Sequence, residues 1–334
     1  MEQSKYYGHP SQLYGVTEYR LMGGKSDGMH MLHVKNGKGL EFTVSADRCA
    51  DISELSLDGK NLSYTSVGGV TAPAYYTEGH DGFGFLKSFN CGFLTTCGLH
   101  NIGTPNVVDG TPYGLHGTIG NIPAEHVRWE ITDEAIILKA EVHDEIIFGS
   151  KLALIRTITV SLNENKLEIH DEIKNTGSKE EGIMCLYHMN IGYPLLSESA
   201  LLAVNSDKVV PRDDRAAEDL DTWSQMIPPV PNFAEQCYYH IFEGNTGCAK
   251  VYNPEINKGL QITFDTEVFP QMTQWKMMGE RDYVLGLEPT TNTLEGRKTI
   301  EEQGKLKTVA PGSSRDIYIQ VSFYDNQVDW ETGK

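Results

Sequence analysis

The chain has 334 residues, enough for one large domain or two ordinary ones, and its 39% hydrophobic content excludes a disordered protein. The 28 lysines and arginines stand against 46 aspartates and glutamates, which gives a net charge of −18. This charge argues against nucleic acid or an anionic membrane as a partner, and it disfavours a highly phosphorylated substrate.

Strand patterns recur along the whole chain. Alternating residues or apolar runs predict strands at 39–45, 51–57, 157–162, 167–173, 183–187, 267–287 (a pair of strands) and 315–323. The two segments within 157–173 flank a short polar turn, so they form a predicted hairpin with one buried face. Residues 183–187 are apolar in both phases of the alternation, which is typical of a central strand that is covered on both faces.

Helical and irregular segments are fewer. Residues 213–226 predict a helix, because an aspartate begins the segment, its apolar residues share one face and Pro228-Pro229 follows it. Residues 68–114 are rich in glycine and aromatic residues without periodicity, so we expect long loops there, and such loops often carry the functional site. The pattern as a whole predicts an all-β protein: one domain over residues 1–334, folded as a large antiparallel two-sheet β-sandwich with one or two short helices.

Cysteine spacing and hydropathy indicate the cellular compartment in which we expect the protein. The six cysteines include no C-x-x-C pair, which is typical of reduced thiols in a cytosolic protein. The first residues form no apolar signal segment, and no stretch has the length of a membrane span. We therefore expect a cytoplasmic protein without a membrane partner.

Three polar residues adjoin apolar strand patterns and are candidates for catalysis. Glu288 ends an apolar run and precedes Pro289, as expected for a carboxylate at the mouth of a buried strand. His188 follows the buried strand at 183–187, and His116 precedes a glycine that allows close approach of a ligand. One carboxylate and two imidazoles suffice for proton transfer at neutral pH.

The sequence around these residues resembles a known superfamily. Leu115-His116-Gly117, Tyr187-His188-Met-Asn190 and Gly286-Leu-Glu288-Pro289 are similar, in order and rough spacing, to motifs of the aldose 1-epimerase (galactose mutarotase-like) superfamily. The resemblance covers roughly residues 15–325 and implies a two-sheet sandwich that binds sugars in an open cleft. It also implies an enzyme that interconverts the α and β anomers of a monosaccharide without a cofactor. Glu288 would then be the base and His188 the acid, while His116 would stabilise the opening ring.

The resemblance is incomplete in the rest of the cleft. Members of the superfamily usually place an arginine near the first histidine, whereas this chain has His100 there and could supply the cation from Arg48. Glu235 is the candidate for a further acidic residue, and Trp275 could stack on a sugar ring. The expected substrate-binding residues are His100, Asn101, Arg48, Asn190, Glu235 and Trp275. These departures indicate a divergent branch of the superfamily.

Two other functions stay open at this point. A metal-dependent sugar isomerase or epimerase could use a divalent ion bound by the histidines and Glu288, although the sequence shows no tight local ligand spacing. A carbohydrate-binding protein without turnover could share the fold, although it would not need both an acid and a base. The expected partner is a monosaccharide in every case; we predict no metal site for the epimerase and leave a homodimer open.

Overall fold

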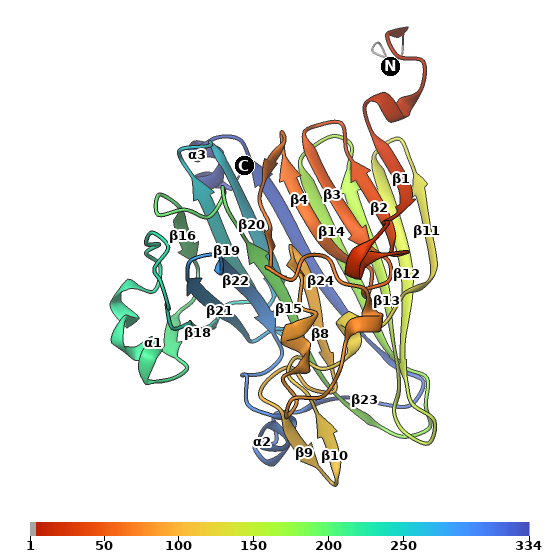
Figure 1. Cartoon of the computed structure of the whole chain (residues 1–334), viewed down its shortest axis with the longest axis vertical. Helices are drawn as coiled ribbons and strands as arrows, with labels where there is room; N and C mark the ends of the chain where they lie inside the picture. The colour runs from red at the N-terminus through yellow and green to blue at the C-terminus, as the bar shows by residue number, and fades with distance from the viewer. Residues whose placement is uncertain (1–4, 334) are drawn as a thin grey trace.

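Antiparallel β-sheets dominate the computed structural model, which describes residues 5–333 (Figure 1). The largest sheet has eight strands: β11 (Glu125–Ile131), β12 (Ala135–Glu145), β13 (Lys151–Ser161), β14 (Lys166–Asn175), β24 (Ser314–Tyr324), β20 (Lys258–Asp265), β19 (Thr246–Asn253) and β16 (Leu201–Val204), in that order. The predicted hairpin is confirmed as β13 and β14, and the last predicted strand as β24.

The second large sheet positions the candidate site. It contains β17 (Lys208–Pro211), β18 (Gln236–Ile241), β21 (Gln271–Met278), β22 (Tyr283–Thr290), β15 (Glu181–Ile191) and β23 (Lys307–Val309), in that order, with β8 (Leu94–Leu99) also paired to β15. The predicted central strand at 183–187 is confirmed as part of β15, where every residue from 183 to 191 is buried.

Smaller elements complete the chain. A five-stranded sheet contains β1 (Gly15–Arg20), β2 (His30–Lys35), β3 (Leu40–Ser45), β4 (Asp51–Leu57) and β5 (Lys60–Asn61). Two short ribbons pair β6 (Tyr64–Thr65) with β7 (Cys91–Gly92), and β9 (Asn106–Val108) with β10 (Thr111–Tyr113). The α-helices of the described residues are α1 (Asp214–Glu218), α2 (Arg297–Glu302) and α3 (Gln327–Thr332). No helix in the described part of the chain is long and apolar enough to cross a membrane.

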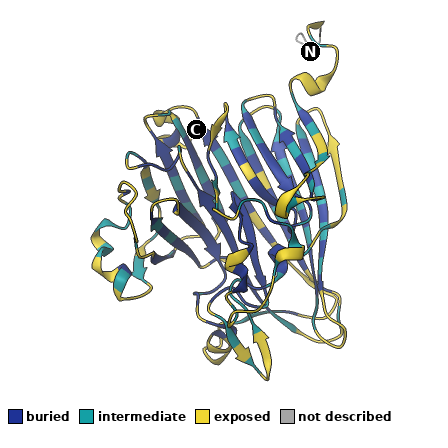
Figure 2. Ribbon diagram, viewed as in Figure 1, coloured by how far each residue is buried: buried dark blue, intermediate teal, exposed yellow. Residues whose placement is uncertain are grey.

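One hydrophobic core joins the three larger sheets. Phe42 of β3, Ile158 of β13 and Leu285 of β22 belong to the same cluster of buried side chains. Figure 2 shows the buried residues along the strands, while the β9–β10 hairpin and most of α1 are exposed. Alternate residues of β12 are buried, as expected for a strand with one face on the core. The predicted all-β sandwich is therefore confirmed.

One expectation about local structure was wrong, and another was incomplete. The helix expected at 213–226 is only α1 followed by a 3-10 turn at Leu220–Thr222, because Asp219 and the prolines beyond favour other backbone conformations. The expected loop region at 68–114 contains β8, whose six residues are all buried. Its sequence is rich in threonine and glycine and has no apolar alternation, so the partner strand β15 determines its conformation.

Candidate active site

Neighbouring strands bring His188 and Glu288 together. In the β15–β22 pair, Leu186 lies opposite Thr290 and Met189 opposite Leu287, so His188 and Glu288 occupy facing positions. Side chains at facing positions point to the same side of a sheet. The Nε2 atom of His188 lies 3.3 Å from Oε1 of Glu288, and the two residues are 3% and 1% exposed. Two residues that are 100 positions apart in the sequence are thus adjacent in the fold.

Gly286 makes room for this carboxyl group. Gly286 and Glu288 lie on the same face of β22, two residues apart. A Cβ atom at position 286 would lie 2.4 Å from Oε1 of Glu288, closer than any real carbon–oxygen contact of this kind. The glycine therefore lets the Glu288 side chain lie back over its own strand, toward Trp275.

His116 enters the site from a loop. Its backbone has φ of 60°, and Gly117 after it has φ of 68°, a left-handed pair that directs the ring toward the sheet. Its ring centroid lies 5.4 Å from that of His188. Its Nδ1 atom lies 2.9 Å from the carbonyl oxygen of Ile102. A carbonyl oxygen only accepts hydrogen bonds, so Nδ1 carries the hydrogen and the lone pair is on Nε2.

Burial opposes charge on all three candidates. Burial, together with the negative charge of Glu235, raises the pKa of Glu288 well above its usual range, and Arg212 partly offsets this rise. Burial lowers the pKa of His188 well below its usual value, and the neighbouring His116 lowers it further. Burial also lowers the pKa of His116 to about 4. The empty site therefore favours a protonated Glu288 and two neutral imidazoles.

These residues line a cavity of about 270 Å³. That volume lies just below the range of about 300–1,000 Å³ that is typical of ligand pockets, so it suits a small molecule. The residues that surround the cavity are Phe83, Leu86, Phe89, Gly103, Thr104, Leu115, His116, His188, Arg212, Glu235, Cys237, Thr273, Trp275, Glu288 and Leu294. Most of the wall is apolar or aromatic, and the polar groups are concentrated on the floor around Glu288 and at the rim.

Two of the predicted substrate-binding residues lie at the cavity. Trp275 of β21 is half-buried, and its Nε1 donates a hydrogen bond of 2.7 Å to Oε2 of the exposed Glu235. The indole ring is therefore held in one orientation, with its centroid 5.4 Å from that of the His188 ring and the two planes nearly perpendicular. Such a fixed aromatic ring is suited to stacking on the apolar face of a sugar.

The other predicted binding residues do not line the cavity. His100 faces Asp144 at 3.7 Å, and the Asn101 amide donates to the carbonyl groups of Gly103 and Gly114. Asn101 thus supports the loops that carry the wall of the site.

Arg48 and Asn190 are also behind the site. Arg48 is 2% exposed and donates to the carbonyl oxygen of Thr71, while the Asn190 amide donates to the carbonyl oxygen of His188. The arginine of the cleft is instead Arg212, which sequence reasoning missed. Its signal was available, because Arg212 directly follows the short apolar segment Val209-Val210-Pro211, much as Glu288 ends an apolar strand.

A family described as a domain of unknown function, DUF4432, matches residues 26–323. The chain belongs to this family. No curated protein matches the chain.

Solved structures of similar fold support the predicted superfamily. A Klebsiella pneumoniae protein, provisionally assigned as an aldose 1-epimerase, is 27% identical over 97% of this chain and 88% of its own, with a TM-score of 0.90. A galactose mutarotase-like protein from Clostridium acetobutylicum is 14% identical over 95% of this chain and all 100% of its own, with a TM-score of 0.68. Galactose 1-epimerase from Lactobacillus acidophilus is 14% identical over 94% of this chain and 100% of its own, with a TM-score of 0.61. The predicted resemblance to the aldose 1-epimerase (galactose mutarotase-like) superfamily is confirmed, and the DUF4432 match is consistent with a divergent branch.

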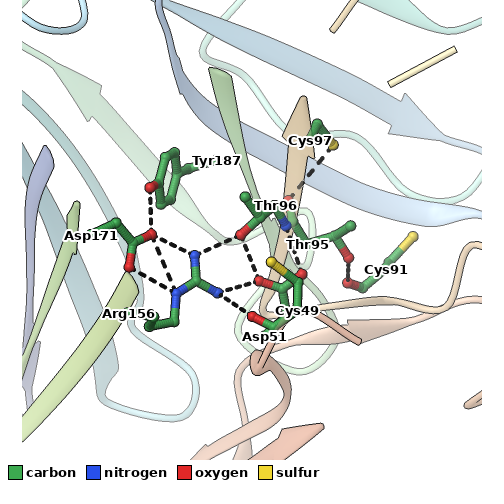
Figure 3. Close-up of polar contacts among 9 residues, drawn as sticks. All are labelled: Cys49, Asp51, Cys91, Thr95, Thr96, Cys97, Arg156, Asp171 and Tyr187. Atoms are coloured by element: carbon green, nitrogen blue, oxygen red, sulfur yellow. Dashed lines mark hydrogen bonds and ion pairs between the residues drawn. The ribbon is translucent and has the colours of Figure 1, made fainter. Parts of the chain in front are cut away.

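A buried polar network supports the site of this DUF4432 chain from below (Figure 3). Its members are Asp51, Thr96, Arg156, Asp171 and Tyr187, all at most 5% exposed. Arg156 donates to both oxygens of Asp171 and, at 2.6 Å, to Asp51, while the Tyr187 hydroxyl donates to Asp171 at 2.5 Å. The network joins strands of all three larger sheets, and it holds β15 at the residue before His188.

The described residues also bear on a possible metal site and on the state of the cysteines. Within residues 5–333, no group of three or more histidine, cysteine, aspartate or glutamate side chains is arranged to hold a metal ion. The six cysteines are free thiols, five of them buried.

Proposed function

We propose that this DUF4432 chain is an isomerase of the aldose 1-epimerase type, which opens and recloses the ring of a monosaccharide to interconvert its anomers. One observation carries the proposal: the carboxyl group of Glu288 and the imidazole of His188 lie 3.3 Å apart on the floor of a small cavity. The match in fold to proteins assigned to this activity supports it.

The reaction needs two proton transfers at one carbon. A base removes the proton of the anomeric hydroxyl while an acid protonates the ring oxygen, and the C1–O5 bond breaks. Both oxygens are bonded to C1, so two groups that lie side by side can reach both. Ring closure on the other face is the reverse process, in which each group recovers its original proton state. No redox step and no cofactor are required.

Burial determines which member of the pair begins as the acid. The neutral pair has Glu288 protonated and His188 with a free lone pair, so Glu288 protonates the ring oxygen and His188 accepts the hydroxyl proton. This starting state reverses the roles that the sequence suggests. After ring opening the roles exchange, because Glu288 must recover the proton when the ring closes.

The remaining groups orient the sugar. Nε2 of His116 accepts a hydrogen bond from a sugar hydroxyl, since its Nδ1 hydrogen is held by Ile102. The hydroxyl of Thr273, which lies opposite Glu288 on β21, is buried without a hydrogen-bond partner in the described structure. A buried hydroxyl left unpaired is costly, so a sugar hydroxyl that bonds to it would add to binding.

The test is the relaxation of pure anomers toward equilibrium. We expect the purified protein to accelerate the mutarotation of at least one monosaccharide, followed by optical rotation or by anomeric proton exchange in NMR. Activity should survive a chelator, because the groups that transfer protons are side chains. Loss of activity in chelator and its return with a divalent ion would favour the metal-dependent isomerase, and sugar binding without turnover would favour the non-catalytic protein.

A further inference from the structure

Arg212 is an arginine at the cavity that has no acidic partner. Among the ion pairs of residues 5–333, none involves Arg212, so no carboxylate oxygen lies within 4 Å of its guanidinium nitrogens. Arg215, only three residues later, pairs with both Glu218 and Asp219 at 2.9 Å. The adjacent Asp213 is engaged elsewhere, because its side chain accepts the hydrogen bond that caps α1.

The contacts that Arg212 makes with the described residues include no ion pair with a carboxylate. Its backbone N–H donates to the carbonyl oxygen of Cys237, and its Nη1 lies 3.8 Å from the Cys237 sulfur. Burial raises the pKa of the Cys237 thiol to about 12, so this sulfur is an uncharged partner. A guanidinium has five N–H donors, and among residues 5–333 this sulfur is the one side-chain partner of Arg212, which lines the cavity.

Arg212 lies at the opposite end of the cavity from the proposed acid–base pair. Arg212 is exposed and lies at the mouth, whereas Glu288 and His188 are buried at the floor. A monosaccharide whose anomeric carbon meets the floor directs the far side of its ring toward the mouth. The substituent on that side therefore lies next to the free guanidinium, between apolar walls that strengthen any electrostatic contact.

Building on the proposed function, we propose that the substrate is a sugar acid: a monosaccharide with one carboxylate, bound by Arg212, and with its anomeric carbon at Glu288 and His188. A carboxylate matches the planar fork of a guanidinium and binds it through two parallel hydrogen bonds. It supplies the partner that Arg212 lacks in the empty cavity.

Charge distinguishes a carboxylate from a phosphate. Among the described residues that line the cavity, Arg212 is the one lysine or arginine, and Glu235 adds a negative charge at the same rim. The whole chain carries a net charge of −18, which repels a dianion more strongly than a monoanion. A single negative charge on the sugar is thus the best match.

The first experiment measures binding without turnover. Methyl glycosides cannot open their rings, so the methyl glycosides of glucose and galactose and those of the corresponding uronic acids report recognition alone. Titration calorimetry with wild-type protein should give tighter binding of the methyl uronides, and Arg212→Gln should weaken this binding by about 10- to 100-fold, the range for a hydrogen bond to a charged group. Arg215→Gln, which removes a charge of the same kind that already has partners, should leave it unchanged.

The second experiment measures mutarotation of the free sugars. We expect a higher kcat/KM for glucuronate or galacturonate than for glucose or galactose, with Arg212→Gln raising KM for the uronates by a larger factor than for the neutral sugars. If Arg212→Gln lowers kcat/KM equally for neutral and acidic sugars, Arg212 only tunes the proton affinity of Glu288. A preference of the wild type for a hexose 6-phosphate would indicate a site for a dianion. Either result overturns the inference.

The two experiments separate the inference from the proposed function. Turnover of neutral sugars without any preference for uronates, in binding or in rate, refutes the sugar acid and leaves the epimerase intact. Tight, Arg212-dependent binding of methyl uronides without mutarotation of any sugar refutes the epimerase and leaves the recognition of an acidic sugar intact.

Discussion

Replacement of Glu288 by glutamine is the sharpest test of the proposed chemistry. The carboxamide has the size of the carboxyl group, and it replaces a side chain that is 1% exposed and already favours its uncharged form. It keeps the contact with Gly286 and His188 but has no acidic proton to transfer to a ring oxygen. Proton transfer by a positioned side chain contributes about 10²- to 10⁴-fold, so kcat should fall at least about 100-fold while KM changes only several-fold.

The same variant has a predictable effect on stability. The folded protein holds the Glu288 proton to a higher pH than the unfolded chain does, because the pKa of Glu288 is raised in the fold. The wild type therefore loses stability as the pH rises above the ordinary glutamate pKa, by about 1.4 kcal/mol for each unit of elevation, until the raised pKa is reached. Glu288→Gln lacks this loss, so its free energy of unfolding should fall less than that of the wild type between pH 5 and pH 9.

The assay combines anomer relaxation with urea denaturation at several pH values. Glu134→Gln is the matched control, because Glu134 is exposed in the turn between β11 and β12 and is not part of the cavity wall. A Glu288→Gln protein that retains wild-type kcat would refute the role of this carboxyl group in proton transfer. An unchanged dependence of stability on pH would refute the argument that burial raises its pKa.

Further predictions address the pH profile, the positioning of the site and the unity of the fold. Activity should persist below pH 6.5, because the lowered pKa values of His188 and His116 keep both rings neutral. It should decline as the pH rises through the raised pKa of Glu288, whereas a decline only on the acidic side would make Glu288 the initial base. Gly286→Ala should lower kcat by about 100-fold, since the new methyl group displaces the Glu288 carboxyl group; wild-type kinetics would show that the carboxyl position is not critical. Tyr187→Phe removes one of the donors to buried Asp171, which keeps its bonds from Arg156, and should lower the free energy of unfolding by about 1–3 kcal/mol in urea; an unchanged midpoint would mean that the network tolerates the loss. A fragment that ends near residue 200 should show no cooperative melting transition, because β14 and β15 lose the partner strands β24 and β22; a cooperative melt would refute a single domain.

The sequence by itself determined the class of fold and the superfamily. Alternating residues report which face of a strand is buried, and this local signal correctly predicted the hairpin of β13 and β14 and the two-sided burial of β15. The order of the motifs around His116, His188 and Glu288 was enough to identify the superfamily. Burial of a strand face depends on residues that are close in sequence, and the superfamily is identified from the order of its motifs. Both kinds of information can be read directly from the sequence.

Only the tertiary structure decided which polar groups meet. The register that places His188 opposite Glu288 joins strands about 100 residues apart, and it results from packing of whole sheets rather than from local preference. The same holds for the cation of the cavity: Arg48 and Arg212 each have aspartates nearby in sequence, yet Arg48 is buried behind the site and Arg212 stands unpaired at its mouth. Sequence distance does not reveal whether a charge has a partner, because side chains such as Asp213 are committed by the fold to other donors.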